Sequence, residues 1–276
     1  MTAMAAKRGD IFAANRAIGR VALSVKSVGG KTRRDEVEEA GSLRVRCPGA
    51  PARELEAVII NTAGGIAGGD RFALDIAAGQ GTRLVVTTAA AEKVYRTLGP
   101  ESVIDVKLDV AAGATLAWLP QETILFDRAR LSRSIEVDLA PDAQLLLAEA
   151  IVFGRTGMGE TVGEGVLFDR WRVRQGGKLI YAEGVRLDGP IAERLGAACV
   201  AKGGIAIATV LIVPGNDETI EAVRALQDQF TGEVGASAWN GLAAVRLCAA
   251  DGAALRHDLI HVMTALRGEL PRIWTN

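Results

Sequence analysis

The chain has 276 residues, enough to bury a sizeable core in one large domain or two small ones. Its formal net charge of −1 gives no electrostatic reason to expect nucleic acid or an anionic membrane as a partner. No apolar run reaches the roughly 18 residues of a transmembrane helix. Residues Met1–Arg8 lack the apolar core of a signal peptide, and the three cysteines stand far apart, so we expect a cytoplasmic protein with reduced thiols.

The first part of the chain predicts short strands separated by turns. Residues 1–15 are expected to form a frayed tail. From Gly19 to Lys26, apolar residues alternate with polar or small ones, as they do in a half-buried strand. The apolar run Ala57–Ile60 predicts a buried strand, and the segment Gly64–Asp70 after it has four glycines in six positions. This composition predicts a tight turn of bare backbone that ends in one carboxylate.

The middle of the chain repeats imperfectly. The segment Asp75–Gly79 is echoed by Asp109–Gly113 and again by Asp138–Asp142, at offsets of 34 and 29 residues. Each copy reads as a strand end, a small turn and a new strand. Repeats of this length predict stacked β-rungs that cover each other's apolar faces. Because the period is irregular, we expect a distorted β-helix or layered sheets rather than a regular solenoid.

Helical periodicity is clear only in the last third of the chain, at residues 216–230 and 253–267. Before these segments, residues 166–187 predict strands with a hairpin turn at Gly176-Gly177, and Asn240-Gly241 predicts a second hairpin. We therefore expect a mainly β chain in one domain over residues 1–276. A β-rich body would cover residues 16–190, and a small C-terminal α+β part with about two helices would cover residues 191–276.

The glycine-rich segment Gly64–Asp70 is the first candidate site. It lacks the lysine of a P-loop, Asp70 would repel a phosphate, and the next residues alternate like a strand instead of opening a helix. A tight strand crossover is the simplest interpretation, and a ligand-binding enzyme built on this loop remains an alternative.

Several acidic residues stand at turns or inside otherwise apolar strands. Glu149 lies within the apolar run Leu145–Phe153, and Glu183 follows Leu179–Ala182, where a carboxylate is costly unless it is paired or solvated. One interpretation is a buried ion pair with an arginine near in sequence, such as Arg155 or Arg186. The other is a set of oxygen ligands along an internal water-filled path for a hydrated divalent ion, since oxygen ligands hold such ions weakly. The set comprises Asp70, Glu122, Glu149, Glu160, Glu164 and Glu183.

The two histidines, His257 and His261, lie four residues apart in the second helical segment, a spacing that can hold a metal ion. No acidic or cysteine partner completes a recognisable zinc pattern, so packed or solvated histidines are the simpler interpretation. The chain also shows no Ser/His/Asp order, no Cys/His nucleophile motif and no acid pair typical of hydrolysis. No catalytic residue is predicted.

Five short motifs occur in order along the chain. They are Asn61–Asp70, Thr87–Arg96, Trp118–Glu122, the pair Phe153–Arg155 with Met158–Glu160, and Pro271–Trp274. With these motifs the chain resembles the family of the urease accessory protein UreD, also called UreH, over nearly its whole length.

The resemblance implies a mostly β, helix-poor fold and no catalysis. Family members are scaffolds that help load nickel into apo-urease in a complex with UreF, the GTPase UreG and the urease apoprotein, without a tightly bound cofactor. GTP hydrolysis belongs to UreG, which agrees with the missing P-loop here. The resemblance carries a transient Ni(II) path onto Glu149 and Glu183, with Asp70 as a weaker third. Thr87-Thr88 and Tyr95 are lining or partner-contact positions, with core packing as an equal alternative, and a pure docking scaffold without a metal path remains open.

Overall fold

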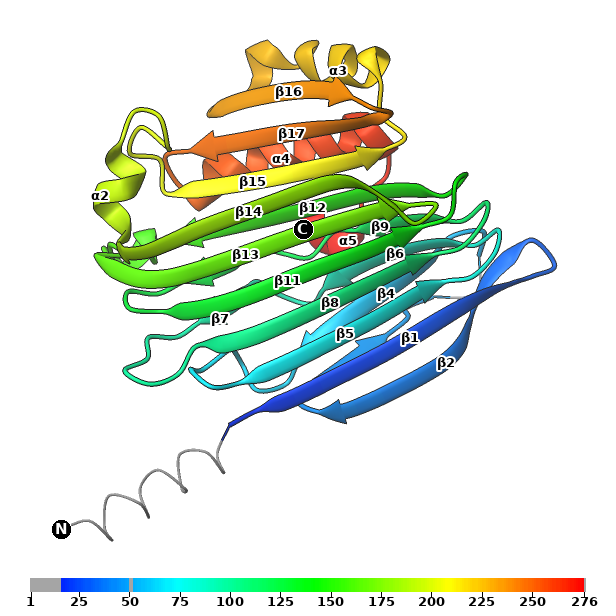
Figure 1. Cartoon of the computed structure of the whole chain (residues 1–276), viewed down its shortest axis with the longest axis horizontal. Helices are drawn as coiled ribbons and strands as arrows, with labels where there is room; N and C mark the ends of the chain where they lie inside the picture. The colour runs from blue at the N-terminus through cyan, green and yellow to red at the C-terminus, as the bar shows by residue number, and fades with distance from the viewer. Residues whose placement is uncertain (1–15, 50–51, 276) are drawn as a thin grey trace, which may run out of the picture.

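The computed structural model describes residues 16–49 and 52–275. Two β-sheets face each other over most of this length, and a smaller group of strands and helices extends one of them (Figure 1). The expectations for the first 15 residues, a frayed tail without a signal peptide, lie outside the described residues.

The first sheet has seven strands in the order β14-β13-β11-β8-β5-β1-β2. Its five central strands run parallel, and β2 and β14 close the two edges in antiparallel pairing. The strands are β1 (Ile18–Val28), β2 (Lys31–Gly41), β5 (Arg71–Ala78), β8 (Ser102–Val110), β11 (Arg130–Leu139), β13 (Glu164–Gln175) and β14 (Lys178–Pro190).

The second sheet has ten strands, with a main path β16-β17-β15-β12-β9-β6-β4-β3 and two short strands, β7 and β10, beside it. Strands β4, β6, β9 and β12 are parallel, and the last three strands are added in antiparallel pairing. The strands are β3 (Leu43–Arg46), β4 (Leu55–Asn61), β6 (Arg83–Thr88), β7 (Glu92–Val94), β9 (Thr115–Trp118), β10 (Thr123–Leu125), β12 (Gln144–Phe153), β15 (Ala206–Val213), β16 (Glu233–Trp239) and β17 (Leu242–Ala249).

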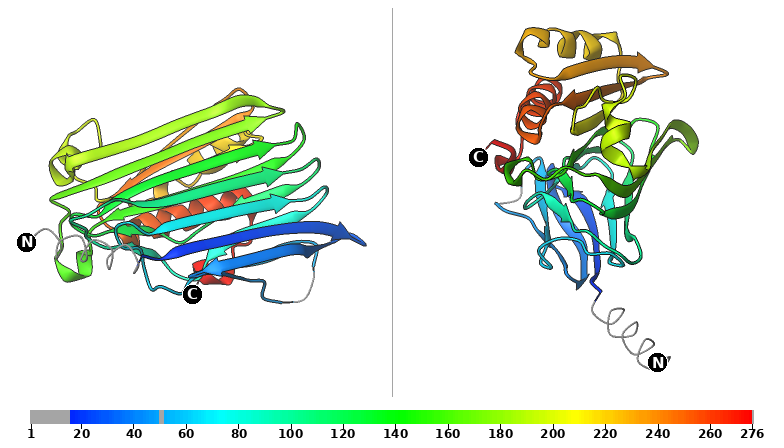
Figure 2. Two further views of the ribbon diagram at one scale, coloured as in Figure 1. Left: turned by 60° about the horizontal axis from the view of Figure 1, so that its bottom comes forward. Right: turned by 90° about the vertical axis from the view of Figure 1, so that its left-hand side faces the viewer.

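The chain winds between the two sheets. From β4 to β13 it adds strands to the second and the first sheet in turn, so each winding contributes one main rung to each face (Figure 2). The β-helix-like, layered arrangement predicted from the repeats is confirmed. Asp138 lies opposite Asp109, as the offset of 29 requires, but Asp109 lies opposite Ala77 and not Asp75. The first offset is therefore two residues shorter than predicted. The turns after β5 and β8 have the same length, since Ala78 lies opposite Val110 and Arg83 opposite Thr115, so the similar segments Asp75–Gly79 and Asp109–Gly113 are out of register by two residues.

The main core lies between the sheets, and a second one lies on the outer face of the ten-stranded sheet. Alternate residues of β12 reach the two cores: Leu147 and Ile151 face the other sheet, whereas Ala148 and Val152 face the outer core. A strand that is buried on both faces reads as a continuous apolar run, as the stretch Leu145–Phe153 does. Glu149 has the same phase as Leu147 and Ile151, so its carboxylate is directed between the sheets.

Two predicted helices are present with altered bounds. Asn216 caps α3 (Asp217–Arg224) by accepting a hydrogen bond from the Thr219 N–H, but the helix stops well before Phe230 and a 3-10 turn, η2 (Gln227–Gln229), follows. The second, α4 (Gly252–Arg267), begins after Asp251 and ends at Gly268, whose φ is 84°. The described residues also form α2 (Ile191–Gly196), α5 (Arg272–Thr275) and the 3-10 turn η1 (Thr156–Met158), which are too short to show a helical period.

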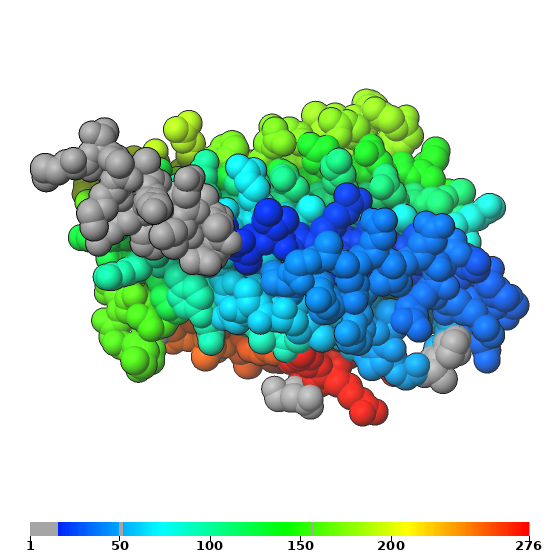
Figure 3. Space-filling view, turned by 90° about the horizontal axis from the view of Figure 1, so that it is seen from below, coloured from blue at the N-terminus to red at the C-terminus, as the bar shows by residue number. Residues whose placement is uncertain are grey.

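Helix α4 lies on the outer face of the ten-stranded sheet, and the C-terminal segment returns to the body beside it (Figures 1 and 2). The buried indole of Trp274 donates to the Leu119 carbonyl at 3.0 Å, and the Arg256 guanidinium lies 4.6 Å from the Trp274 ring centroid. At the end of the body far from α3, strands β1 and β2 lie at the surface (Figures 1 and 3). Within the described residues, no helix is long and apolar enough to cross a membrane.

Candidate functional site

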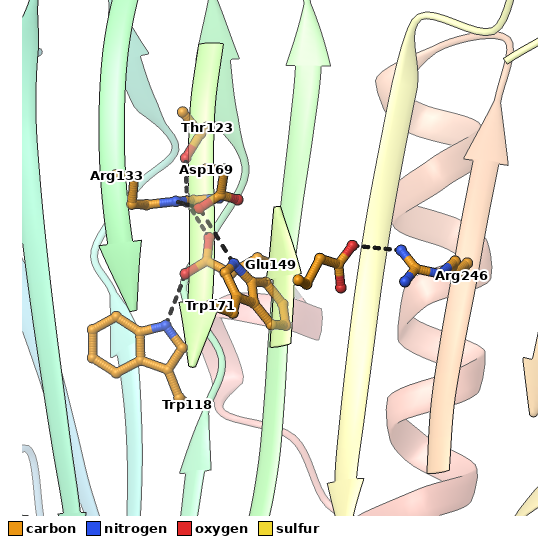
Figure 4. Close-up of polar contacts among 8 residues, drawn as sticks. Trp118, Thr123, Arg133, Glu149, Asp169, Trp171 and Arg246 are labelled. Carbon is orange, nitrogen blue, oxygen red and sulfur yellow. Dashed lines mark hydrogen bonds and ion pairs between the residues drawn. The ribbon is translucent and has the colours of Figure 1, made fainter. Parts of the chain in front are cut away.

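A buried arginine joins two buried carboxylates between the sheets. Arg133 on β11 and Asp169 on β13 lie opposite each other in register, and Glu149 reaches them from β12 of the other sheet (Figure 4). The Arg133 Nε donates to Asp169 Oδ1 at 3.0 Å and Nη2 donates to Oδ2 at 2.6 Å, while Nη1 donates to Glu149 Oε2. All three side chains are at most 5% exposed. We call these three residues the acidic junction.

Two tryptophans complete the hydrogen bonds of the acidic junction. The Trp118 Nε1 donates to Glu149 Oε1 at 2.8 Å, and the Trp171 Nε1 donates to Asp169 Oδ1 at 3.3 Å. Each carboxylate oxygen therefore accepts at least one hydrogen bond. The indoles are neutral, however, so two carboxylates share one guanidinium and the junction carries one formal negative charge in excess. Such a charge is costly in a buried site.

The pKa values of the junction reflect this imbalance. Burial raises the pKa of Glu149 above its usual range, the Asp169 carboxylate raises it further, and Arg133 and Trp118 only partly offset this. Burial alone would lower the pKa of Arg133, but Asp169 and Glu149 raise it above its ordinary value, so the guanidinium stays charged. The excess negative charge can be neutralised by a proton on Glu149 or by a second cation.

The ion-pair interpretation of Glu149 therefore holds, but with another arginine. Arg155 pairs with Glu160 at 2.8 Å, and Arg186 lies opposite Phe168 at the edge of the seven-stranded sheet. Closeness in sequence was a poor guide, because consecutive strands belong to different sheets and the partner of Glu149 comes from the facing sheet.

Glu183 makes a second link between the sheets. It lies on β14, its side chain is only 9% exposed, and its Oε1 accepts a hydrogen bond from Arg246 Nη1 on β17 at 2.5 Å. The Tyr181 hydroxyl donates to Glu183 Oε2. Burial and the Glu183 carboxylate both raise the pKa of Tyr181, so this hydroxyl remains a donor at neutral pH. Thr209 lies between Glu149 and Arg246 in one row across the ten-stranded sheet.

Three cavities meet at Glu149 and Glu183. The first, of about 60 Å³, lies between the sheets and reaches Glu149 and Arg133. The second, of about 20 Å³, has both Glu149 and Glu183 in its wall. The third, of about 410 Å³, opens at the surface beside Glu183 and Arg246. The second cavity is large enough for about one water molecule. The structure thus brings Glu149 and Glu183 into the wall of one small cavity.

Asp70 has a different environment. It is 3% exposed, its Oδ1 accepts from the Ala17 N–H at 2.8 Å, and its Oδ2 accepts from the Ala67 N–H at 2.7 Å. It is not among the residues that line the three cavities. The structure does not bring Asp70 together with Glu149 and Glu183, and its bonds hold the glycine turn against the start of β1.

The glycines of this turn are explained by close packing. A Cβ at Gly65 would lie 2.5 Å from the Tyr95 ring, and a Cβ at Gly68 would lie 2.1 Å from Thr97 Oγ1. Chain atoms therefore fill the space that a phosphate cradle would need at these two positions.

Comparison with known proteins shows the family of this chain. The family model described as "UreD urease accessory protein" matches residues 17–275. The chain belongs to the UreD family. A urease accessory protein UreD of Rhodopseudomonas palustris (strain BisA53) is 56% identical over 266 residues, which cover 96% of this chain and 93% of the relative. "Urease accessory protein UreD 3" of Bradyrhizobium sp. (strain BTAi1) is 54% identical over 273 residues, which cover 99% of this chain and 98% of the relative.

Three of the five motifs of this UreD-family chain meet at the first cavity. Asn61 donates a hydrogen bond to the Glu92 carboxylate at 3.0 Å, and both residues line the cavity with Trp118. Arg256 of α4 contacts the third motif, Trp118–Glu122, from the outer face of the sheet. Its Nη1 donates hydrogen bonds to Gln121 Oε1 and to Glu122 Oε1, each at 2.8 Å. The motifs thus surround the approach to Glu149 rather than a separate pocket.

Thr87, Thr88 and Tyr95 of the second motif have different environments, and of the three only Thr88 lines the first cavity. Thr87 is fully buried, and its hydroxyl has no hydrogen-bond partner among the described residues. Thr88 lines the first cavity and accepts a hydrogen bond from the Gln121 N–H. Tyr95 is 36% exposed, donates to the Gly64 carbonyl at 2.8 Å and packs edge-on against Phe126.

Arg133 and Asp169 were not predicted as site residues. Each stands at an inward position of an alternating strand, between apolar neighbours of the same phase: Leu131 and Ile135 for the arginine, Leu167 and Trp171 for the aspartate. A charged residue at a strand position where the alternation predicts an apolar, inward-facing side chain could have identified both residues. Across the described residues, no group of three or more His, Cys, Asp or Glu side chains is arranged to hold a metal ion.

Proposed function

We propose that this chain is a non-catalytic urease accessory protein that takes part in nickel insertion into apo-urease. In this proposal it acts in the cytoplasm, in a complex with UreF and the GTPase UreG, and conducts Ni(II) through its interior past Glu149 and Glu183. The family and the names of the relatives support the role in urease maturation. The single observation that supports the interior path is the position of Glu149, one of two carboxylates that share a single guanidinium, in the walls of two cavities.

The geometry sets a condition on the passage of an ion. Both oxygens of Glu149 already accept hydrogen bonds, one from Trp118 and one from Arg133. Each carboxylate oxygen has a second lone pair that a metal ion could use. The Arg133 guanidinium beside Glu149 would repel such an ion, so displacing Arg133 from Glu149 would favour binding. Since the second cavity has a volume of about 20 Å³, the ion would have to shed most of its water before it reached Glu183. Weak oxygen ligands suit such a transfer better than tight storage.

The test is co-expression of a tagged copy of this chain with the urease subunits and the other accessory proteins, followed by pull-down and nickel analysis of the urease. We expect UreF and urease to be recovered with the chain, and nickel loading to be lost when the chain is omitted. Full loading in its absence would refute the accessory role.

The path itself is tested by Glu149→Gln, which keeps the size of the side chain and removes its charge. We expect an intact complex and a lower nickel content of urease. Glu136→Gln is the matched control, because Glu136 is a partly exposed glutamate on β11 that pairs with Arg170. Wild-type nickel content with Glu149→Gln would remove Glu149 from the path.

A docking scaffold without a metal path is the second candidate. It is favoured by the hydrogen bonds that the junction carboxylates already accept. Through these bonds Arg133 links Asp169 in its own sheet to Glu149 in the facing sheet. Combining Glu149→Gln with Glu183→Gln separates the two functions. Full urease activation by an intact complex of this variant would support the scaffold, and loss of nickel from an intact complex would support the path.

A further inference from the structure

The two histidines of the chain form an ordered pair on the outer surface of α4. The ring centroids of His257 and His261 lie 4.3 Å apart, and their planes meet at 44°. The His257 side chain is 47% exposed. The pair stands on the outer side of the ten-stranded sheet, where α4 packs, whereas Glu149 and Glu183 line cavities between the sheets. It is therefore separate from the proposed interior path.

Both rings are oriented through their Nδ1 atoms. His261 Nδ1 lies 2.8 Å from the His257 carbonyl oxygen, and His257 Nδ1 lies 3.1 Å from Asp258 Oδ1. A carbonyl oxygen only accepts hydrogen bonds, so the neutral His261 ring carries its hydrogen on Nδ1. The same holds for His257, whose partner oxygen belongs to a carboxylate that also accepts hydrogen bonds from Thr231 and Gly232.

Asp258 is fixed in place by backbone and side-chain donors. Its side chain is 1% exposed. Its oxygens accept hydrogen bonds from the Thr231 N–H at 2.9 Å, the Thr231 hydroxyl at 3.0 Å and the Gly232 N–H at 2.7 Å. The carboxylate is thus fixed as an acceptor for the His257 Nδ1–H.

In the neutral state, both Nε2 atoms are then left with free lone pairs. Histidines that bind metal ions usually donate their other ring N–H to a carboxylate or a backbone carbonyl, which fixes the tautomer and the ring orientation. His257 has a carboxylate partner, Asp258, and His261 has a backbone carbonyl partner, that of His257. Ala253 and Ala265, one turn away on either side, are too small to cover the rings.

We propose that His257 and His261 form a surface site for a divalent late first-row transition metal ion, bound through the two Nε2 atoms. Imidazole nitrogen suits Ni²⁺, Cu²⁺ and Zn²⁺, with bonds of about 2.0–2.1 Å for Zn²⁺. No third His, Cys, Asp or Glu among the described residues joins the pair. Water fills the other coordination positions, so the site exchanges its ion readily.

The test is calorimetric titration of the full chain, purified without a histidine tag, with Ni²⁺ alone. We expect His257→Gln/His261→Gln to lose one Ni²⁺ site per chain, and each single variant to lower the affinity of that site at least tenfold, because chelation needs both rings. Thr264→Ala, an exposed change on the same helix, is the matched control and keeps the site. Circular dichroism and thermal melting confirm that the variants are folded.

Electron paramagnetic resonance with Cu²⁺ gives an independent readout. The wild-type chain should show coupling to two imidazole nitrogens, and the double histidine variant should lose it while Glu149→Gln retains it. Unchanged Ni²⁺ stoichiometry and affinity in the double variant would overturn the site. So would full affinity in either single variant, or nitrogen coupling that survives in the double variant.

Discussion

Arg133 and Asp169 lie opposite each other on neighbouring parallel strands and are joined by two hydrogen bonds, Nε to Oδ1 at 3.0 Å and Nη2 to Oδ2 at 2.6 Å. This forked pairing fixes the plane of the guanidinium. The remaining nitrogen, Nη1, is thereby directed at Glu149 on the facing sheet. One pair within a sheet thus positions the cation that links the two sheets.

The first prediction concerns this cation. Arg133→Met leaves Glu149 and Asp169 buried beside each other without their shared counter-charge. We expect a loss of about 3–5 kcal/mol in the free energy of unfolding, the range found when one partner of a buried ion pair is removed. Urea denaturation followed by circular dichroism measures the loss.

Two further variants control this measurement. Arg130→Met, an exposed change on the same strand, should alter stability by no more than about 0.5 kcal/mol. Adding Glu149→Gln and Asp169→Asn to Arg133→Met removes both buried charges and should recover part of the loss. A single Arg133→Met variant as stable as the wild type would show that the guanidinium is not needed to hold the carboxylates.

Asp70→Asn is expected to destabilise the fold without affecting metal transfer. Both Asp70 oxygens accept backbone N–H bonds, from Ala17 and Ala67, and an amide can accept only one of them. The unpaired, buried N–H should cost about 1–3 kcal/mol. Thermal unfolding and nickel content of co-expressed urease are the two measurements. Stability like the wild type with reduced nickel would instead place Asp70 on the path.

Gly68→Ala tests whether packing fixes the glycine turn. The added Cβ would lie 2.1 Å from Thr97 Oγ1 and 2.7 Å from the Pro100 carbonyl oxygen, so the loop has to shift. We expect a loss of about 1–3 kcal/mol in stability. Gly157→Ala is the control, since its Cβ would meet no atom within 4 Å. Equal melting temperatures of the two variants would contradict the packing explanation.

Much of the fold could be predicted because its signals are local and repeated. Alternating residues marked the strands, and Gly176-Gly177 and Asn240-Gly241 occupy the hairpin turns expected of them. The register of neighbouring windings could not be predicted, because segments of similar sequence, such as Asp75–Gly79 and Asp109–Gly113, lie two residues out of register in the sheet. The extent of α3 was overestimated because Phe230 keeps a helical spacing although the chain has already left the helix.

The site was only partly predictable for a different reason. Glu149 stood out as a charge inside an apolar run, and Glu183 as a charge after one. Their partners could not be identified, because Arg133 and Arg246 come from strands of the opposite sheet. Whether a carboxylate in a turn is paired by side chains or by backbone N–H groups, as Asp70 is, also depends on tertiary structure.

The last prediction concerns Glu92, which lines the first cavity and accepts a hydrogen bond from Asn61. Burial raises the pKa of Glu92 above the ordinary 4.5, and the Asn61 bond only partly offsets this. The folded chain therefore binds this proton more tightly than the unfolded chain. In the pH range between 4.5 and the raised pKa, stability falls as pH rises, and the penalty persists at neutral pH.

Glu92→Gln removes the ionisation and keeps an oxygen that can accept from Asn61. We expect the variant to unfold at a higher temperature than the wild type at neutral pH, and this gain to shrink toward about pH 3, where the wild-type carboxyl is neutral in both states. Thermal melting at several pH values measures the difference. Glu101→Gln, an exposed change, should shift stability by no more than about 0.5 kcal/mol throughout. A Glu92→Gln variant that is less stable than the wild type at neutral pH would show that the cavity holds this carboxylate in its charged form, which would make Glu92 a further oxygen ligand to test in nickel transfer.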